Sequence, residues 1–217
     1  MRGGDAAYGK RQEHLTDITA AVSVDTPCAS LIIVADQWGI RQIRPRSSSS
    51  PVARPDHVIA GDTESRTRGD IAEDVADAHV LSLGESTGDG RANPACIKAL
   101  RLAERARREL IEYVEGQRRE FTLPLRPEGT AFQRRVWEAV ASIPYGQART
   151  YGDIARMIGN PRAARAVGGA NNANPILIVT PCHRVVGARG ALVGYAGGLE
   201  MKQWLLDMES GSHCSDR

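Results

Sequence analysis

The sequence lacks any long hydrophobic run and any leader-like segment. No apolar stretch approaches the ~18 residues of a membrane-spanning helix. Met1 to Asp25 alternates charged and small side chains and has no apolar core of a signal peptide. We therefore predict a cytoplasmic protein, nucleoid-associated when bound to DNA, with no membrane partner.

Closely paired cysteines are also missing. The four cysteines stand far apart, at positions 28, 96, 182 and 214, and no two are separated by only two residues. This spacing supports neither a disulfide framework nor a zinc finger. We expect separate thiols in a reducing compartment, so the question is which thiol is placed for chemistry.

A strong overall charge is absent, but one segment is basic. The chain carries 28 basic and 26 acidic residues, a net charge of +2. Arg134 to Arg189 holds eight arginines and two acidic residues, which leaves +6 on about a quarter of the chain. Such a patch is either a solvated face or a surface that binds a polyanion.

Composition and length indicate a globular protein, and the strand and helix patterns of its N-terminal part predict an α/β domain. The 217 residues are 41% hydrophobic and 25% charged, enough for a sizeable core. After a tail at 1–20, short strands are predicted around Ser30–Ala35 and Gly39–Ile43, joined by a turn. An irregular insertion is expected at about 45–95, with a strand near His79–Leu83.

A helix from about Cys96 to Glu115 completes this domain, which we place at 21–120. The C-terminal domain, 121–209, is predicted to be mostly α-helical and is followed by a tail at 210–217. Thr130 and Gln133 form a capping box before an apolar helix face that ends at Pro144.

Two short helices follow in a helix-turn-helix pattern. Thr150 opens the first, which continues to Ile158, and Gly159 ends it. Asn160 is expected to cap the second, with Pro161 in its first turn. Alanine and glycine dominate that helix, which either allows close packing on another helix or lets it enter a narrow DNA groove.

Cys182 is the candidate nucleophile. A buried strand, Ile176–Val179, is predicted to lead into Pro181, and His183 and Arg184 beside the sulfur would lower the pKa of the thiol. Adjacent residues point in opposite directions, so His183 would need a bridging water or a turn to act as base. A cysteine protease or a metal site is less consistent with this pattern. A glycine-rich loop to Gly198 and a final helix, 199–209, end the domain.

These motifs resemble the O6-alkylguanine-DNA alkyltransferases, also called methylated-DNA–protein-cysteine methyltransferases. The resemblance covers Thr130 to Glu209 and agrees in order and spacing with five motifs: Pro181-Cys-His-Arg-Val185, Ala164-Arg-Ala-Val-Gly168, Tyr151, Asn174-Pro, and Gly194-Tyr-Ala-Gly-Gly-Leu199 with Lys202 and Trp204. The N-terminal half agrees more loosely, and residues 45–95 depart from the family.

The resemblance implies a catalytic role for five residues. Cys182 would accept the alkyl group and keep it. His183 would take the thiol proton through a water and would be oriented by Glu209. Asn174 would hold this network, and Tyr151 would donate a proton towards the guanine ring.

The resemblance also implies a DNA surface and a base pocket. Arg165 would fill the gap left by the flipped nucleotide, although an ordinary phosphate contact is the plain alternative. The remaining predicted DNA contacts are Arg162, Ala164, Gly168, Arg135 and Arg184. The pocket would be lined by Tyr195, Val185, Ala196, Gly197 and Pro181.

The same resemblance leads us to predict no zinc and no cofactor. Some family members bind zinc in the N-terminal domain, but Asp36 and Arg41 stand where two ligands would align. Cys28 and Cys96 are then structural.

The predicted function is single-use repair of O6-alkylguanine, and of O4-alkylthymine, in double-stranded DNA by a monomer. Two rivals remain. An alkyltransferase-like protein would bind lesions without chemistry, but such relatives replace the cysteine. A transcription regulator would need polar base-reading side chains on the second helix, where alanine and glycine stand.

Overall fold

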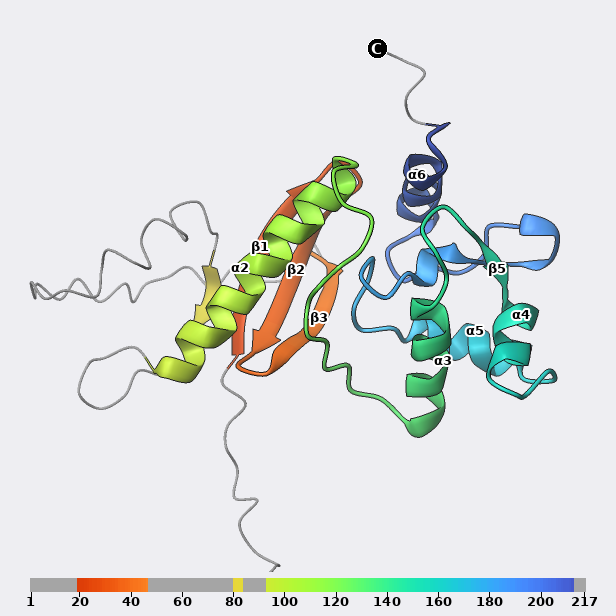
Figure 1. The fold of residues 1–217 in the computed structure, drawn as a ribbon, viewed down its shortest axis with the longest axis horizontal. Helices are drawn as coiled ribbons and strands as arrows, with labels where there is room; N and C mark the ends of the chain where they lie inside the picture. The colour runs from red at the N-terminus through yellow and green to blue at the C-terminus, as the bar shows by residue number, and fades with distance from the viewer. Residues whose placement is uncertain (1–18, 47–79, 84–92, 213–217) are drawn as a thin grey trace, which may run out of the picture.

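The computed structural model describes residues 19–46, 80–83 and 93–212. A β-sheet with one long helix forms the N-terminal half, and a group of helices with two short strands forms the C-terminal half beside it (Figure 1). The predicted division into an α/β part followed by a mostly helical part is confirmed at this level. Most of the predicted insertion at 45–95 lies outside the described residues.

The sheet of the N-terminal half has four antiparallel strands in the order β3-β2-β1-β4. Its strands are β1 (Thr19–Thr26), β2 (Ala29–Asp36), β3 (Gly39–Pro45) and β4 (Val80–Leu83). The predictions of β2, β3 and β4 are confirmed. The strand β1 was not predicted, and the expected tail at 1–20 is too long because Thr19 and Ala20 already pair with β2.

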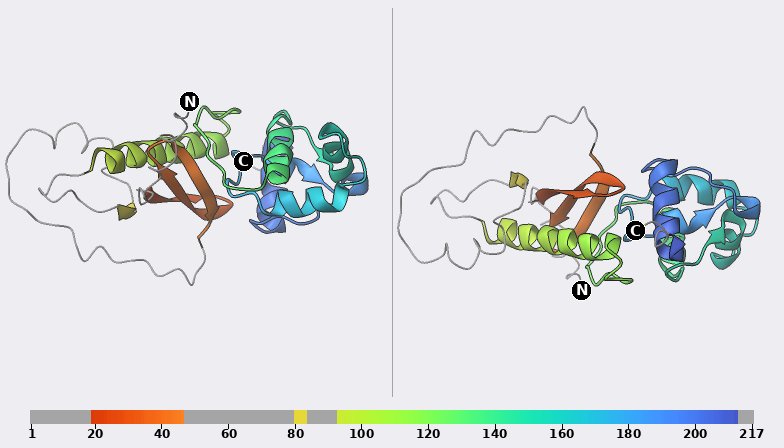
Figure 2. Two further views of the ribbon diagram at one scale, coloured as in Figure 1. Left: turned by 90° about the horizontal axis from the view of Figure 1, so that it is seen from below. Right: turned by 90° about the horizontal axis from the view of Figure 1, so that it is seen from above.

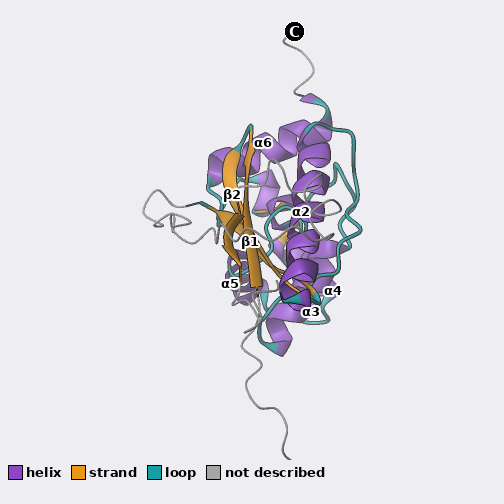
Figure 3. Ribbon diagram, turned by 90° about the vertical axis from the view of Figure 1, so that its left-hand side faces the viewer, coloured by secondary structure: helices purple, strands orange, loops and turns teal. Residues whose placement is uncertain are grey.

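A single helix, α2 (Pro94–Val114), covers one face of the sheet (Figures 2 and 3). It begins where the sequence provides a start signal, because the Asn93 side chain accepts a hydrogen bond from the Ala95 amide at 2.9 Å and Pro94 stands in the first turn. It ends before Gly116, whose φ of +77° is the left-handed conformation that glycine adopts without strain. The helix predicted from Cys96 to Glu115 is therefore confirmed.

Two of the four α-helices described in the C-terminal half begin at side-chain caps, and two do not. The elements are α3 (Ala131–Ala141), β5 (Arg149–Thr150), α4 (Tyr151–Met157), α5 (Ala164–Asn172), β6 (Val185–Val186) and α6 (Leu199–Ser210). Thr130 and Thr150 each form a complete capping box. The prediction that Asn160 caps the next helix, with Pro161 in its first turn, is wrong. Helix α5 starts after Ala163 and has no side-chain cap, because the chain makes a turn first.

The two halves are joined through the outer edge of β3. Its Ile40 exchanges backbone hydrogen bonds with the segment before α3, to Pro124 O and from Arg126 N, both at 2.8 Å. Further along, Ile43 bonds Pro175 O at 2.9 Å and accepts from Leu177 N at 3.0 Å. The exposed edge that a terminal strand would leave is therefore paired by chain from the other half.

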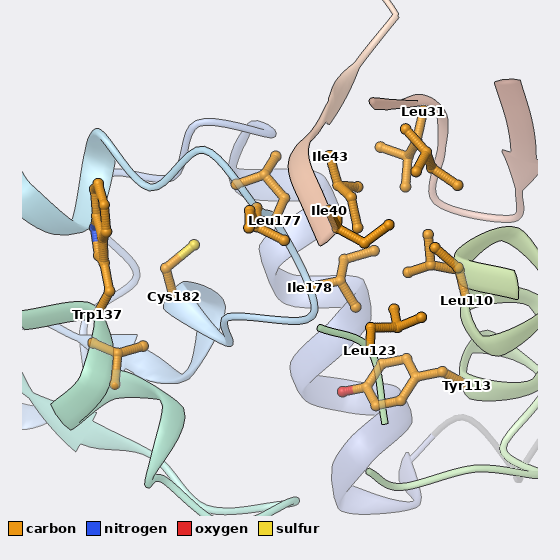
Figure 4. Close-up of a cluster of buried hydrophobic side chains, with 14 of the residues drawn as sticks. Leu31, Ile40, Ile43, Leu110, Tyr113, Leu123, Trp137, Leu177, Ile178 and Cys182 are labelled. Carbon is orange, nitrogen blue, oxygen red and sulfur yellow. The ribbon is translucent and has the colours of Figure 1, made fainter. Parts of the chain in front are cut away.

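The predicted strand Ile176–Val179 does not form. Only Ile176 makes a bridge, and Ile178 then takes a φ of +69°, a strained value for a β-branched residue. Such strain costs about 1–3 kcal/mol. Burying an isoleucine side chain returns a similar amount, about 1.5–3 kcal/mol. Figure 4 shows Leu177 and Ile178 between Cys182 on one side and Ile40 and Ile43 on the other, where all are buried.

Candidate active site

Cys182 lies at the start of a one-turn 3-10 helix, directly after the curled segment that contains Ile178. Its sulfur accepts a hydrogen bond from Asn174 Nδ2 at 3.0 Å, and the residue is only 1% exposed. The same amide group also donates to Thr180 O at 3.0 Å and Ile176 O at 3.2 Å. Asn174 therefore fixes the curl of the chain and the position of the sulfur together.

The thiol of Cys182 is a weak acid in this environment. Burial raises its pKa to about 11, against the smaller opposing effects of the Asn174 hydrogen bond and the Lys202 charge. The expectation that neighbouring charges lower this pKa is therefore wrong. Because the resting thiol keeps its proton at neutral pH, nucleophilic attack requires a base close by.

His183 and Glu209 form a buried pair beside this thiol. His183 Nε2 lies 2.5 Å from Glu209 Oε1, and both side chains are almost fully buried. Burial lowers the pKa of His183, although the Glu209 charge opposes this shift. The imidazole is therefore neutral at pH 7. The contact with the carboxylate places its proton on Nε2, which leaves Nδ1 as the basic nitrogen.

His183 Nδ1 is buried and has no hydrogen-bond partner among the described residues. A buried imidazole nitrogen without a partner is uncommon, because leaving it unsatisfied costs about 1–3 kcal/mol. The predicted bridging water would satisfy it and would carry a proton from Cys182. The structure thus brings together the thiol, the base and the carboxylate predicted for this site.

Glu209 stays ionised although it is buried. Burial alone would raise its pKa, but hydrogen bonds from His183, Tyr113 and Arg184 outweigh that effect and lower the pKa to about 2. Its Oε2 accepts from Arg184 Nε at 2.8 Å and from Gly146 N at 3.0 Å, while Tyr113 donates to Oε1. Together, these hydrogen bonds hold the Glu209 carboxylate in one orientation.

The prediction that Arg184 contacts DNA is wrong. Arg184 is only 6% exposed, and its guanidinium binds Glu209, the Ile143 carbonyl oxygen at 2.6 Å and the Tyr113 hydroxyl at 3.2 Å. A buried arginine needs such partners, and all of them lie inside the protein. Arg184 therefore stabilises the carboxylate that contacts His183.

Tyr151 stands at the first position of α4, half-buried, and donates to the Val193 carbonyl oxygen at 3.1 Å. Burial and the nearby Cys182 raise the pKa of its hydroxyl, so it remains a proton donor. Lys202, whose role the sequence did not indicate, donates to the same Val193 oxygen at 2.9 Å and to Val185 O at 2.6 Å. Lys202 therefore fixes the loop that contacts Tyr151.

The predicted pocket residues divide into buried and exposed groups. Tyr195, Val185 and Pro181 are buried, whereas Ala196 is exposed and Gly197 is partly exposed. The Tyr195 ring stands edge-on to His183 at 6.3 Å between centroids, and its hydroxyl has no partner among the described residues. Gly197 permits this packing, since a Cβ there would lie 2.5 Å from Met201 Sδ and 2.7 Å from the Tyr195 ring.

The predicted DNA-contact residues other than Arg184 are at or near the surface. Arg162 is exposed in the turn before α5 and Arg165 is exposed in its first turn, whereas Ala164 and Gly168 are partly exposed. Gly168 lies behind Tyr151, since a Cβ there would come within 3.8 Å of its ring. Arg135 is exposed but also donates to the Ile158 carbonyl oxygen at the end of α4.

Asp36, aligned with a zinc ligand of some family members, is here part of an ion cluster. Its carboxylate accepts from Arg41 at 3.1 Å and from Arg126 at 2.7 Å, and also from the Trp38 and Gly39 amides of the turn. Two guanidinium groups in direct contact leave no site for a cation. Across the described residues, no group of three or more histidine, cysteine, aspartate or glutamate residues is placed to hold a metal ion.

Comparisons with known proteins agree with this arrangement. Residues 131–211 match the family described as "6-O-methylguanine DNA methyltransferase, DNA binding domain". The chain is 58% identical over 104 residues to a methylated-DNA–protein-cysteine methyltransferase of Methanosarcina acetivorans, covering 48% of this chain and 67% of that protein. It is 55% identical over 101 residues to the inducible counterpart of Bacillus subtilis, covering 46% of this chain and 56% of that protein.

Solved structures extend the similarity to the N-terminal half. The O6-methylguanine methyltransferase of Mycobacterium tuberculosis superposes with a TM-score of 0.63 and 32% identity, over 92% of this chain and 97% of that one. The M. tuberculosis protein solved in complex with DNA gives a TM-score of 0.61 and 33% identity, over 87% and 91%. The chain belongs to the methylated-DNA–protein-cysteine methyltransferase family. In the described part of the chain, no helix is long and apolar enough to cross a membrane.

Proposed function

We propose that this protein repairs O6-alkylguanine in double-stranded DNA by moving the alkyl group to Cys182. O4-alkylthymine, which presents a similar alkylated oxygen, is the second proposed substrate. The observation that carries the proposal is the geometry of one cluster: a buried thiol held by Asn174, with a neutral imidazole fixed by Glu209 beside it. The family membership supports the same reaction.

The proposed reaction needs only groups that this chain supplies and one bridging water. The Cys182 proton passes through a water to His183 Nδ1, and the thiolate attacks the alkyl carbon. A sulfur–carbon bond forms while the bond from that carbon to O6 breaks, and its electron pair moves into the guanine ring. Tyr151 donates its hydroxyl proton to the ring, which leaves as ordinary guanine. The thioether stays on Cys182, so each molecule acts once and needs no cofactor.

The DNA is proposed to bind along α4 and α5, which act as a helix-turn-helix. An alkylated O6 in the base stack cannot reach a buried sulfur, so the nucleotide must be flipped out of the duplex. Helix α5 has small side chains that would permit close approach to a minor groove, and the exposed Arg165 would fill the gap. Arg162 and Arg135 would contact phosphates.

Intact-mass spectrometry with an O6-methylguanine duplex tests this proposal. We expect a single adduct of about 14 Da, corresponding to one transferred methyl group in place of a proton, mapped to Cys182. An unmodified duplex of the same sequence should give none. A Cys182→Ala variant should give no adduct yet bind the duplex within a few-fold of the original affinity, since the thiol contacts no phosphate. An adduct at Cys28 or Cys96 alone would contradict the proposal.

The alternative is a protein that binds lesions without chemistry. The presence of Cys182, with the buried His183–Glu209 pair next to it, does not favour it. The same experiment separates the two proposals, because a pure binder would hold the duplex and never gain mass. Size-exclusion chromatography would test the proposed monomer, and imaging of a tagged protein would test the proposed cytoplasmic, nucleoid-associated location.

A further inference from the structure

Tyr113 is a residue of the N-terminal half that reaches the candidate active site. It lies in the last turn of α2, fully buried, and Figure 4 shows its hydroxyl directed away from that helix. The hydroxyl donates to Glu209 Oε1 and accepts from Arg184 Nη2 at 3.2 Å. A hydrogen bond thus connects the long helix of one half to the catalytic carboxylate of the other.

The ring of Tyr113 is held rigidly on both sides. Phe121 packs at 4.9 Å between centroids, and Tyr145 packs edge-on at 5.9 Å. Burial and the Glu209 charge raise the pKa of Tyr113 well above its usual value, so the hydroxyl keeps its proton and remains a donor. The donor is therefore fixed in place and in protonation state.

Glu209 Oε1 is shared between Tyr113 and His183. We infer that Tyr113 is a positioning residue that sets the basicity of His183 by withdrawing charge from the carboxylate oxygen they share. The effect on the transfer rate rests on the proposed function, whereas the effect on the pKa of His183 does not. Without the phenol, the full charge of Oε1 would face the imidazole, stabilise its protonated form and remove the base at a higher pH than before.

Other charged and titratable groups around His183 belong to three elements. Arg184 and Cys182 flank it in its own 3-10 turn, and Lys202 and Glu209 face it from α6. Tyr195 packs against its ring from the preceding loop. Arg184 and Lys202 both favour the neutral imidazole, so Glu209 is the group that favours protonation, and Tyr113 moderates it.

The test uses the full chain with Tyr113→Phe and compares it with Tyr145→Phe. Both variants remove one hydroxyl from the same aromatic cluster, but only the first removes a donor to Glu209. Single-turnover transfer is measured from pH 5 to pH 9. In Tyr113→Phe the acidic limb of the rate–pH profile should move up by about half a pH unit or more. The transfer rate should then be roughly threefold lower at pH values below the limb and almost unchanged at pH 9. Tyr145→Phe should keep the original profile.

NMR titration of the His183 ring nitrogens measures the same pKa without any substrate. The pKa should rise in Tyr113→Phe. Site-specific 3-fluorotyrosine at position 113, a stronger donor that preserves the packing, should lower it. If the unmodified chain transfers no alkyl group, the proposed function fails, but this titration still decides the inference. An unchanged pKa in both variants, or a shift in the same direction in both, would make Tyr113 only a link between the halves. If Tyr113→Phe does not fold, the fluorinated protein gives the answer alone.

Discussion

Asn174 Nδ2 lies 3.0 Å from the sulfur of Cys182, and the same amide also binds two carbonyl oxygens of the curled segment between them. The side-chain oxygen of Asn174 in turn accepts from the Ile176 amide at 3.0 Å. One side chain therefore satisfies the polar groups of a non-helical, buried segment and fixes the position of the Cys182 sulfur. The conformation of this segment and the position of the sulfur therefore depend on the same hydrogen bonds.

Asn174→Ala should accordingly impair both stability and transfer. The two carbonyl oxygens keep their backbone donors, but the buried Ile176 amide loses its acceptor, which should cost about 1–3 kcal/mol of unfolding free energy. The thiolate loses its side-chain hydrogen bond, so the transfer rate should fall even where the variant is fully folded. Urea denaturation and single-turnover kinetics measure the two effects. Asn172→Ala, an exposed neighbour at the end of α5, is the control. Normal transfer by folded Asn174→Ala would remove Asn174 from the mechanism.

Glu209→Gln should slow transfer and move its pH dependence downward. The amide carries no charge to support the imidazolium, so the pKa of His183 should fall further and the acidic limb should move to lower pH. At pH 7 the weaker base should reduce the rate by about ten-fold or more. Rapid-quench kinetics across pH give both numbers. This shift is opposite to that expected for Tyr113→Phe. A rate unchanged at every pH would exclude Glu209 from the relay.

Acid should destabilise the protein through the same carboxylate. The pKa of Glu209 is about 2 in the folded state against an ordinary value of 4.5, so the folded state gains stability above pH 4.5 and loses it as the pH falls towards 2. The size of this contribution is on the order of 3 kcal/mol. His183, whose folded pKa is lowered, acts in the same direction below about pH 6.5. Denaturant unfolding at pH 7 and pH 3 measures the free energy of unfolding at each pH. That free energy should fall less between the two pH values for Glu209→Gln than for the original chain.

A matched control comes from the same helix. Glu200→Gln changes an exposed carboxylate in the first turn of α6 and should leave the acid sensitivity as it is. Equal acid sensitivity in Glu209→Gln and the original chain would show that other carboxylates account for the loss.

Lys202→Met should loosen the loop that carries Val193. The ammonium group binds the carbonyl oxygens of Val185 and Val193, and methionine fills the same volume without a donor. We expect the free energy of unfolding to fall by about 1–3 kcal/mol. The reason is that Val185 O loses the Lys202 donor, while Tyr151 still binds Val193 O. Lys98→Met, an exposed lysine on α2, should cost much less. Thermal unfolding of the two variants provides the comparison, and equal stability would contradict the assigned role.

Arg165→Ala should impair repair in duplex DNA more than reaction with free O6-benzylguanine. Extruding a base costs a few kcal/mol, and a side chain that fills the gap should contribute about 1–2 kcal/mol, or roughly ten-fold in rate. The free base has no such cost. Arg162→Ala, at the neighbouring exposed arginine, should instead weaken binding to every DNA. It should also reduce the slope of log binding constant against log salt concentration by about one. Rates on duplex, single strand and free base at two salt concentrations distinguish these roles. Equal losses on duplex and single strand for Arg165→Ala would make it a phosphate contact.

Local signals in the sequence correctly predicted elements whose ends are marked by caps and glycines. Thr130 and Thr150 start helices at the positions where their side chains bind the first amides. Strand β1 was missed because Thr19–Thr26 carries polar residues among its valines, and its partners β2 and β4 lie later in the chain. Ile176–Val179 has the composition of a strand, but Asn174 and the neighbouring half bend it.

The sequence predicted which residues form the candidate site better than it predicted their burial, their partners and their pKa values. Cys182, His183, Glu209 and Asn174 do meet in space. The burial of Arg184 was not visible, because exposure depends on contacts with Ile143 and Tyr113 that lie 41 and 71 positions away. The position of Tyr113 against Glu209, 96 positions later, has no local pattern that could indicate it. The altered pKa of Cys182 follows from burial, which sequence neighbours do not determine.

The burial of Cys182 also affects how the protein survives before it meets a lesion. A thiol that is 1% exposed and holds its proton at neutral pH is a poor target for peroxide, disulfides or free alkylating agents. The proposed reaction can occur only once per molecule, so every accidental modification would remove one repair event. In the proposed reaction, a sulfur that stays inert until the alkylated base reaches it would preserve the whole pool of protein for damaged DNA.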